Sequence, residues 1–260
     1  MSTSSRTRSW EPLAWPLLTA TGLLALWQVG VVWSGTTVFP LPIAVARGVE
    51  QLIQTGVLWR NISDSLYRVG IGYLVAATIG IPAGLAFGWY PTAGQVVNPV
   101  IQLMRPISPL AWIPVAIVLF GVTDTASIFL IFLASFFPIV VSTMNGVRNV
   151  PQVYRRAGRN FGLSPAKLLA RVVLPAALPQ MLVGLRIALG IAWLVVVAAE
   201  MIGANSGLGY VVIDARNSGK RYDLVVAAMI MIGLIGLGMD LAFHRAERAK
   251  QVRWGFRDAA

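Results

Sequence analysis

The feature that most limits how this chain can fold is a succession of apolar stretches, each about as long as a membrane-crossing helix. Such a helix needs about 20 mostly apolar residues. Only 12% of the 260 residues are charged, whereas soluble domains average about a quarter. The sequence therefore predicts an all-α integral membrane protein with six transmembrane helices. The stretches are Pro16–Trp33, Leu66–Trp89, Ile101–Gly121, Ala126–Val147, Met181–Ile202 and Leu224–Phe243.

Positive charge predicts which helix ends face the cytoplasm, because loops on that side carry an excess of Lys and Arg. Arg6 and Arg8 precede the first stretch, and the chain ends in HRAERAKQVRWGFRD. These charges place both termini inside. The outward loop 214–223 is a mild exception to the charge rule, because its three cations are only partly balanced by two Asp. A cleaved signal peptide is the rival interpretation of the first stretch. The loop after the fourth stretch, also placed inside, carries Arg148, Arg155, Arg156, Arg159, Lys167 and Arg171.

The domain organisation that follows is a single transmembrane domain over residues 1–260. Between the first two spans, apolar residues recur at helical spacing, which predicts a short amphipathic helix on the outer surface. Its apolar residues are Val45, Val49, Leu52 and Ile53. The expected cytoplasmic segments are an N-terminal tail at 1–13, a loop at 148–180 and a basic tail at 244–260.

Glycines and prolines within the spans predict where helices approach one another or break. Gly80, Gly84 and Gly88 recur every four residues, a spacing that lets another helix backbone come close, although glycine is also common in membrane helices generally. A broken helix in lipid is tolerated only where protein or a water-filled cavity covers it. The third stretch, which we therefore expect to point inward at a pathway, contains the helix-breaking residues Pro106, Pro109 and Pro114.

Missing residue types exclude several kinds of chemistry. The chain has no cysteine and one histidine, His244, so it offers no disulfide, thiolate metal site or histidine cluster. A net charge of +11 could indicate nucleic acid, but membrane orientation explains the basic clusters better. No G-x-x-x-x-G-K-[ST] phosphate loop occurs, since Arg221 follows Gly219-Lys220. We therefore expect no enzyme activity, bound cofactor, metal or nucleic acid.

The cytoplasmic loop predicts a helical hairpin. Gln152–Phe161 has the composition of a helix, Gly162 marks a turn, and a second helix begins with Ser164 as N-cap and Pro165 in its first position. We expect that helix to stop before Pro175, where a new direction begins. The residues leave two uses open, namely a rigid docking element for a partner and a basic amphipathic hairpin resting on anionic lipid.

The hairpin resembles the cytoplasmic signature of bacterial ATP-binding cassette (ABC) import permeases, written E-A-A, three residues, G, nine residues, I-x-L-P. Arg156-Ala157-Gly158, Gly162 and Val172-Val173-Leu174-Pro175 fit that frame, with Arg156 replacing the acidic residue and Gly158 the second alanine. PISPLAWIPVAIVLFG, FFPIVVSTMNGVRNVP and GLRIALGIAWLVVVAAEMIGANSGLGYVVIDAR look like the nitrate, sulfonate, taurine and bicarbonate branch of these permeases. The likeness extends over about residues 41–254.

This resemblance implies the type I ABC importer permease fold and a translocation subunit for a small, anionic solute in the bacterial inner membrane. The implied partners are ATPase subunits that carry ATP and Mg, an extracytoplasmic substrate-binding protein, a second permease copy and membrane lipid. The reversed charge at Arg156 would demand an acidic groove on the ATPase. The residues expected to couple to the ATPase are Arg155, Arg156, Ala157, Gly158, Gly162, Leu163 and Pro175.

Ionisable residues within spans indicate function by default. Glu200, near the outer end of the fifth span, either lines or gates a pathway or is a structural hydrogen-bond anchor; Asn205 and Ser206 are further pathway candidates. Asp240 is interpreted as a partner for a basic tail residue, and Arg186 as a snorkelling side chain. Two other functions stay open: a secondary transporter, which would work without ATP, and a scaffold, which would dock a partner without solute flux.

Overall fold

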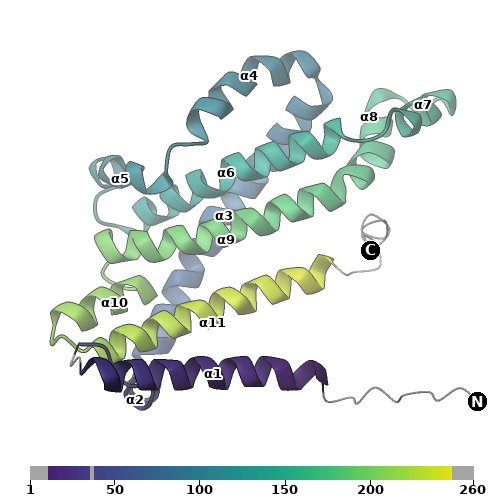
Figure 1. Ribbon diagram of the computed structural model, residues 1–260. Helices are drawn as coiled ribbons and strands as arrows, with labels where there is room; N and C mark the ends of the chain where they lie inside the picture. Colours follow the sequence, from purple (N-terminus) through teal and green to yellow (C-terminus); the bar gives the residue numbers. More distant parts are fainter. Residues whose placement is uncertain (1–10, 36–37, 248–260) are drawn as a thin grey trace, which may run out of the picture.

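The computed structural model describes residues 11–35 and 38–247, and every regular element in that part of the chain is a helix. Long helices run side by side, and a small helical hairpin projects at one end (Figure 1). The predicted tails at 1–13 and 244–260 lie largely outside the described residues. In chain order the elements are α1 (Glu11–Ser34), α2 (Pro42–Gln54), α3 (Val57–Trp89), α4 (Pro91–Met104), η1 (Pro109–Trp112), α5 (Ile113–Phe120), α6 (Asp124–Arg148), α7 (Gln152–Asn160), α8 (Pro165–Leu168), η2 (Leu169–Val173), α9 (Leu174–Gly203), α10 (Leu208–Asn217) and α11 (Tyr222–Glu247).

Four helices among the described residues are long and apolar enough to cross a membrane: α3, α6, the continuous segment 165–203 and α11. A fifth candidate is the pair formed by α4 and the segment 109–120, which meet at an angle of 81°. The apolar stretch at Leu18–Ser34 is shorter than the other candidates. The chain is thus a multi-pass, all-α membrane protein with four or five spans by these criteria.

The third predicted stretch differs most from the structure. We expected one span over residues 101–121, whereas α4 already begins at Pro91 and the chain turns sharply before η1. The physical reason lies in the prolines, because Pro106 and Pro109 supply no backbone donor and stop the helix after Met104. The expected break is therefore present, but it separates two helices instead of bending one.

The core of the bundle is the packing of α3 on α6 and of α6 on α9. A Cβ atom on Gly84 would lie 2.6 Å from Thr143 Cβ, and one on Gly88 would lie 2.7 Å from Val147 Cβ. Glycine is therefore required for α3 to lie this close to α6. Gly72, about three turns before Gly84 on the same helix, makes the same kind of approach to Ile131. The predicted close packing of the glycine face is confirmed.

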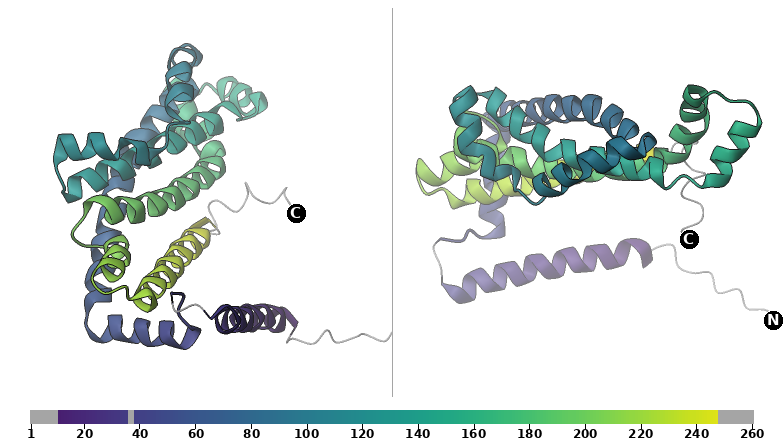
Figure 2. Two further views of the ribbon diagram at one scale, coloured as in Figure 1. Left: turned by 60° about the vertical axis from the view of Figure 1, so that its left-hand side comes forward. Right: turned by 90° about the horizontal axis from the view of Figure 1, so that it is seen from above.

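The short helix predicted between the first two spans is α2, which buries Val45, Gly48 and Leu52 and leaves Ile53 exposed. It packs against α11, where a Cβ on Gly48 would meet the Asp223 carbonyl oxygen at 3.1 Å. In contrast, α1 is set off from the bundle in both views of Figure 2. Its indole Trp27 donates a hydrogen bond to Pro40 O at 3.2 Å and packs against the core cluster.

The helix that carries Pro175 does not stop there, contrary to the sequence expectation. α8, η2 and α9 follow one another without a break from Pro165 to Gly203. Just before the proline the helix widens into a π turn, in which the Leu174 N–H bonds Leu169 O, five residues back. A wider turn gives the pyrrolidine ring the space that a regular α turn denies it. The sequence interpretation did not include α10 either, which follows the 204–207 loop.

Candidate functional site

Three places in the bundle hold functional candidates, and the first is the hairpin of α7 and α8. Its turn is a Schellman motif: Leu163 N–H bonds Gly158 O at 3.1 Å, and Gly162 N–H bonds Arg159 O at 2.9 Å. Gly162 has φ +72°, the left-handed region that glycine adopts without strain. The predicted helix, turn and Ser164–Pro165 helix start all occur in the structure.

The inner face of the hairpin is closely packed. A Cβ on Gly158 would lie 2.5 Å from Leu168 Cδ1 and 3.4 Å from Leu163 Cδ1. Gly158 therefore lets α7 lie against α8. Because the facing atom is the flexible end of a leucine side chain, an alanine there would need only a small shift of Leu168. The glycine that stands here in place of the second alanine of the E-A-A pattern is therefore consistent with the hairpin packing that an alanine would also allow.

The expected coupling residues differ in exposure, and Gly158 is buried and Leu163 half-buried inside the hairpin. Arg155 is half-buried, donates a hydrogen bond to Val147 O at the end of α6, and lies over the Trp89 ring with 5.8 Å to the centroid. Arg155 thus ties the hairpin to α6 and α3. The other expected residues are exposed, namely Arg156, Ala157, Gly162 and Pro175, as are the cations Arg159, Lys167 and Arg171.

Exposed apolar side chains on the hairpin were not singled out from the sequence. Phe161, at the turn, is 86% exposed, and Val153 and Tyr154 on α7 are also exposed. Together with the exposed cations, they form an apolar and basic surface, which we call the hairpin tip surface. In sequence, the available signal was an aromatic residue directly before the turn glycine.

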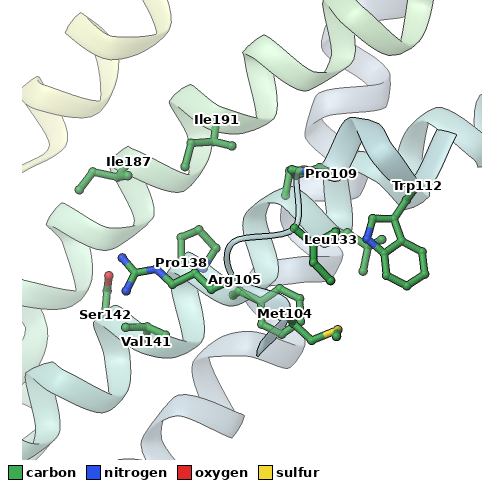
Figure 3. A pocket seen from close by; sticks show the side chains of 13 residues that line it. Met104, Arg105, Pro109, Trp112, Leu133, Pro138, Val141, Ser142, Ile187 and Ile191 are labelled. Atoms are coloured by element: carbon green, nitrogen blue, oxygen red, sulfur yellow. The ribbon is translucent and has the colours of Figure 1, made fainter. Parts of the chain in front are cut away.

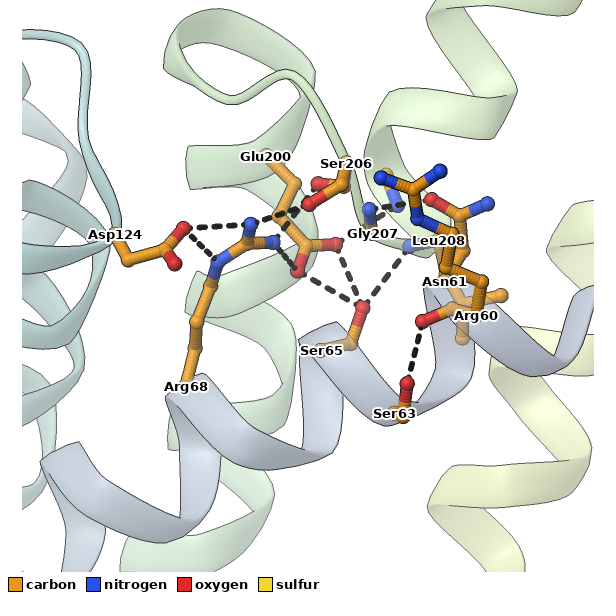
Figure 4. Close-up of polar contacts among 11 residues, drawn as sticks. Arg60, Asn61, Ser63, Ser65, Arg68, Asp124, Glu200, Ser206, Gly207 and Leu208 are labelled. Atoms are coloured by element: carbon orange, nitrogen blue, oxygen red, sulfur yellow. Dashed lines mark hydrogen bonds and ion pairs between the residues drawn. The ribbon is translucent and has the colours of Figure 1, made fainter. Parts of the chain in front are cut away.

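The second place is a buried polar network at the opposite end of α9. Glu200 is 1% exposed, and its carboxylate accepts hydrogen bonds and forms an ion pair (Figure 4). Arg68 Nη1 donates to Glu200 Oε1 at 2.7 Å, Ser65 Oγ donates to the same oxygen at 2.8 Å, and Gly209 N–H donates to Oε2 at 3.0 Å. These contacts join α3, α9 and α10 around the Glu200 carboxylate.

Arg68 extends the network to two further segments. Its Nε donates to Asp124 Oδ1 at 2.8 Å, at the first residue of α6. Its Nη1 and Nη2 donate to the backbone oxygen and side-chain hydroxyl of Ser206, at 2.8 and 2.7 Å. Arg68 was not predicted, although a cation inside a predicted span is a usable sequence signal.

The loop between α9 and α10 is held over the network by backbone donors. Gly207 N–H bonds Asn61 Oδ1 at 2.6 Å, and Leu208 N–H bonds Ser65 Oγ at 2.9 Å. Gly207 has φ +108°, and a Cβ there would overlap the Glu200 carboxylate. Of the predicted pathway residues, Glu200 is buried, Ser206 is half-buried in the network and Asn205 is exposed.

The third place is a cavity of about 370 Å³ between the broken pair α4–η1, α6 and α9. Most of its lining is apolar, with Trp112, Phe137 and Ile187 among the residues. Arg105 and Ser142 provide its charged and hydroxyl groups (Figure 3). The predicted inward orientation of the third stretch is consistent with this cavity, but the sequence interpretation did not name Arg105.

A further ion pair joins α9 to α11. Arg186 Nε and Nη2 donate to Asp240 Oδ1 and Oδ2 at 2.7 and 2.8 Å, and His244 Nδ1 lies 3.4 Å from Arg186 Nη1. Within the described residues, the ion-pair partner of Asp240 is therefore Arg186 of the fifth span, and the expected tail partner falls largely outside the part of the chain that the structure describes. Within residues 11–35 and 38–247, no group of three His, Cys, Asp or Glu side chains could hold a metal ion.

The comparisons with known proteins agree with this architecture. A family model described as "binding-protein-dependent transport system inner membrane component" matches residues 76–251. The taurine transport system permease protein TauC of Escherichia coli is 40% identical over 74% of this chain and 69% of its own. The nitrate import permease protein NrtB of Leptolyngbya laminosa is 38% identical over 83% and 79%. The bicarbonate transport system permease protein CmpB of Synechococcus elongatus is 38% identical over 86% and 84%.

Solved structures share the fold. A chain of a bacterial alginate ABC transporter, in complex with an alginate pentasaccharide-bound periplasmic protein, superposes with a TM-score of 0.62 at 16% identity, over 93% of this chain and 98% of that one. A chain of the MetNI methionine ABC transporter, in an inward-facing conformation, gives 0.66 at 20% identity, over 75% and 97%.

Proposed function

We propose a function from one premise: the chain belongs to the family of binding-protein-dependent transport system inner membrane components and is an ABC importer permease subunit of the nitrate, taurine and bicarbonate type. On this premise, it forms the translocation pathway for a small anionic solute. The solute class is inferred from the names of the relatives and from the cation in the cavity. ATP, with its Mg, is hydrolysed on a separate ATPase subunit.

The proposed topology has six spans and cytoplasmic N- and C-termini in a bacterial inner membrane. In this arrangement α1 supplies the first span and the broken α4–α5 pair supplies the third. The hairpin then lies in the cytoplasm, and the Glu200 network lies at the outer end, because α9 joins the two. Residues 1–260 form one permease domain, with 148–180 as its coupling loop and cytoplasmic tails at 1–13 and 244–260. Two copies of the chain would assemble with two ATPases and an extracytoplasmic binding protein.

The observation that carries the proposal is the geometry of the hairpin. Its tip surface combines exposed cations with Phe161, 86% exposed, which suits docking into a groove that is acidic at its rim and apolar at its base. Its other side is tied through Arg155 to Val147 of α6 and to Trp89 of α3. A displacement of the tip would therefore reach the ends of two spanning helices.

ATP-driven closure of the ATPases would draw the two hairpins together and tilt the attached helices as rigid bodies. Glu200, Asn205 and Ser206 stay proposed as pathway-end residues. In this role, the Glu200 network would hold α3, α6, α9 and α10 together at the outer end, while the hairpin end moves. Because Arg156 stands where an acidic residue would be usual, we expect it to favour an ATPase whose docking groove is acidic.

The experiment that tests this function is a pull-down in mild detergent with co-expressed ATPase subunits. The intact chain is compared with a variant in which residues 157–163 are replaced by a Gly/Ser linker. We expect the ATPase, identified by mass spectrometry, to join the intact chain and to be lost from the variant. If it joins neither chain, the hairpin is a lipid-surface element, and the secondary transporter and scaffold functions take precedence.

A further inference from the structure

The cavity beside the broken span lies halfway along the bundle. The α6 residues that line it run from Leu133 to Ser142, in the middle of a helix that extends from Asp124 to Arg148. Its α9 residues, Ile187 and Ile191, lie in the middle of Leu174–Gly203. Because both helices are candidate spans, the cavity lies near the centre of the hydrocarbon layer.

Arg105 brings a positive charge to this depth. It follows the last residue of α4 and lines the cavity with an exposed side chain. Among residues 11–35 and 38–247 its side chain has neither a hydrogen bond nor an ion pair, whereas the side chains of Arg68, Arg186 and Arg221 each have an acidic partner. An arginine at the centre of a bilayer costs several kcal/mol unless it meets water or a counter-charge, roughly 2.5–3.5 kcal/mol on insertion scales.

The backbone around Arg105 indicates the same water-accessible surroundings. Residues 105–108 are non-helical and connect two helices at 81°. Irregular backbone at membrane depth is tolerated only where it is buried in protein or lines a water-filled cavity. Both the charge and the chain break are therefore explained if the cavity is part of an aqueous pathway.

Snorkelling to lipid headgroups is the alternative explanation for an arginine in a span. The orientation of the side chain counts against it. Its guanidinium lies on the side of the cavity where Ser142 and Pro138 of α6 stand (Figure 3). A side chain that reaches toward the neighbouring helix across the cavity does not extend along the bundle to an interface.

We propose that Arg105, with Ser142, is the contact point for a small oxyanion at mid-pathway; this rests on the proposed importer function. The planar guanidinium fork matches the paired oxygens of nitrate, bicarbonate or a sulfonate head group. Ser142 adds one hydroxyl donor. The apolar remainder of the lining offers the anion no second strong contact. Binding is then weak enough for the solute to leave, as conduction through a pore requires.

The test reconstitutes the full transporter, permease with ATPase and binding protein, in liposomes and measures ATP-dependent uptake of labelled nitrate, taurine and bicarbonate. For the probe that wild type transports, Arg105→Gln should lower uptake about ten- to hundredfold, the loss expected for one charge-assisted hydrogen bond. ATP hydrolysis stimulated by the loaded binding protein should persist. Arg105→Lys should retain more uptake than Arg105→Gln. Arg47→Gln, at an exposed site on α2 outside the cavity, is the matched control and should transport normally.

The outcomes separate the site from the importer function. If Arg105→Gln takes up the probe as fast as wild type does, the anion site alone is overturned. If wild-type uptake does not depend on ATP, or if wild type takes up none of the three probes, the importer function and the site are overturned together. A second readout does not depend on assembly. Iodide quenching of Trp112, obtained by difference against Trp112→Phe in the chain held in nanodiscs, should fall in Arg105→Gln. Equal quenching would also overturn the site.

Discussion

Arg68 on α3 and Glu200 on α9 form a buried ion pair, with 2.7 Å between Nη1 and Oε1, across 132 positions of sequence. Both residues are almost fully buried, at 2% and 1% exposure. Besides Ser65 on α3, the polar partners of the pair lie on other segments: Asp124 starts α6, and Ser206 and Gly209 flank the start of α10. One ion pair therefore fixes the relative positions of four elements at the end of the bundle opposite the hairpin.

Removing one partner of this pair should destabilise the protein strongly. Glu200→Ala leaves Arg68 buried with only Asp124 and Ser206 as partners, and breaking a buried pair typically costs about 3–5 kcal/mol. We expect a corresponding fall in the thermal midpoint of the detergent-purified chain, followed by tryptophan fluorescence. Arg68→Met should cause a similar loss.

The double variant Arg68→Met/Glu200→Leu distinguishes this pairing from general packing effects. Because it removes both charges together, it should be more stable than the sum of the single losses predicts. Strictly additive losses would show that the two side chains do not depend on each other. Asp214→Ala, at an exposed position on α10 whose carboxylate accepts a hydrogen bond from Ser218, is the control and should have little effect.

The glycine face of α3 gives a second prediction. In Gly84→Ala the new Cβ would lie 2.6 Å from Thr143 Cβ and 2.7 Å from the Val140 backbone oxygen, so α3 and α6 must move apart. Overpacking of this kind costs about 1–3 kcal/mol. Gly70→Ala on the same helix has nothing within 4 Å of its Cβ and should be neutral or slightly stabilising. Equal midpoints for the two variants would contradict the close approach.

Much of the fold could be predicted from the sequence because its signals are local. Apolar stretches of spanning length predicted α3, α6, α9 and α11, and the glycine spacing predicted a face of α3 that another helix, α6 in the structure, approaches closely. The hairpin could be predicted because Gly162 and Pro165 act on their immediate neighbours. The helices and the hairpin turn depend on interactions within a few residues of the signal, whereas the glycine face was recognised from its local spacing alone.

The features that could not be predicted depend on distant contacts or on neighbouring geometry. Glu200 alone gave no indication of its partner, because Arg68 lies 132 positions away in the sequence. Pro175 was expected to end a helix, but the π turn at Leu169–Val173 absorbs the strain. Arg105, like Glu200, is a charged residue within a predicted span and could have been selected by the same rule. Its significance, however, depends on the cavity around it.

The hairpin turn gives a third prediction. Gly162→Val should weaken ATPase association and solute flux while membrane insertion survives, because a β-branched residue is strained at φ +72°. Gly162→Asn should keep more of both activities, since asparagine tolerates the left-handed conformation. Co-purification of the ATPase and vesicle uptake measure the effect. If the valine variant docks and transports as wild type does, the hairpin geometry is not required for coupling.

The exposed cation at the start of the signature gives the last prediction. Arg156 is exposed, so Arg156→Glu should leave the free energy of unfolding within about 0.5 kcal/mol of wild type. If the ATPase groove is acidic, the reversal places like charges together, and association should weaken about tenfold or more at low salt. Raising the salt concentration should reduce the difference, because exposed charges are screened.

Arg47→Glu on α2 makes the same charge change away from the hairpin and should bind the ATPase normally. Unchanged or tighter binding by Arg156→Glu would instead indicate a groove that is neutral or basic at this position, and Phe161 would then be the main docking contact.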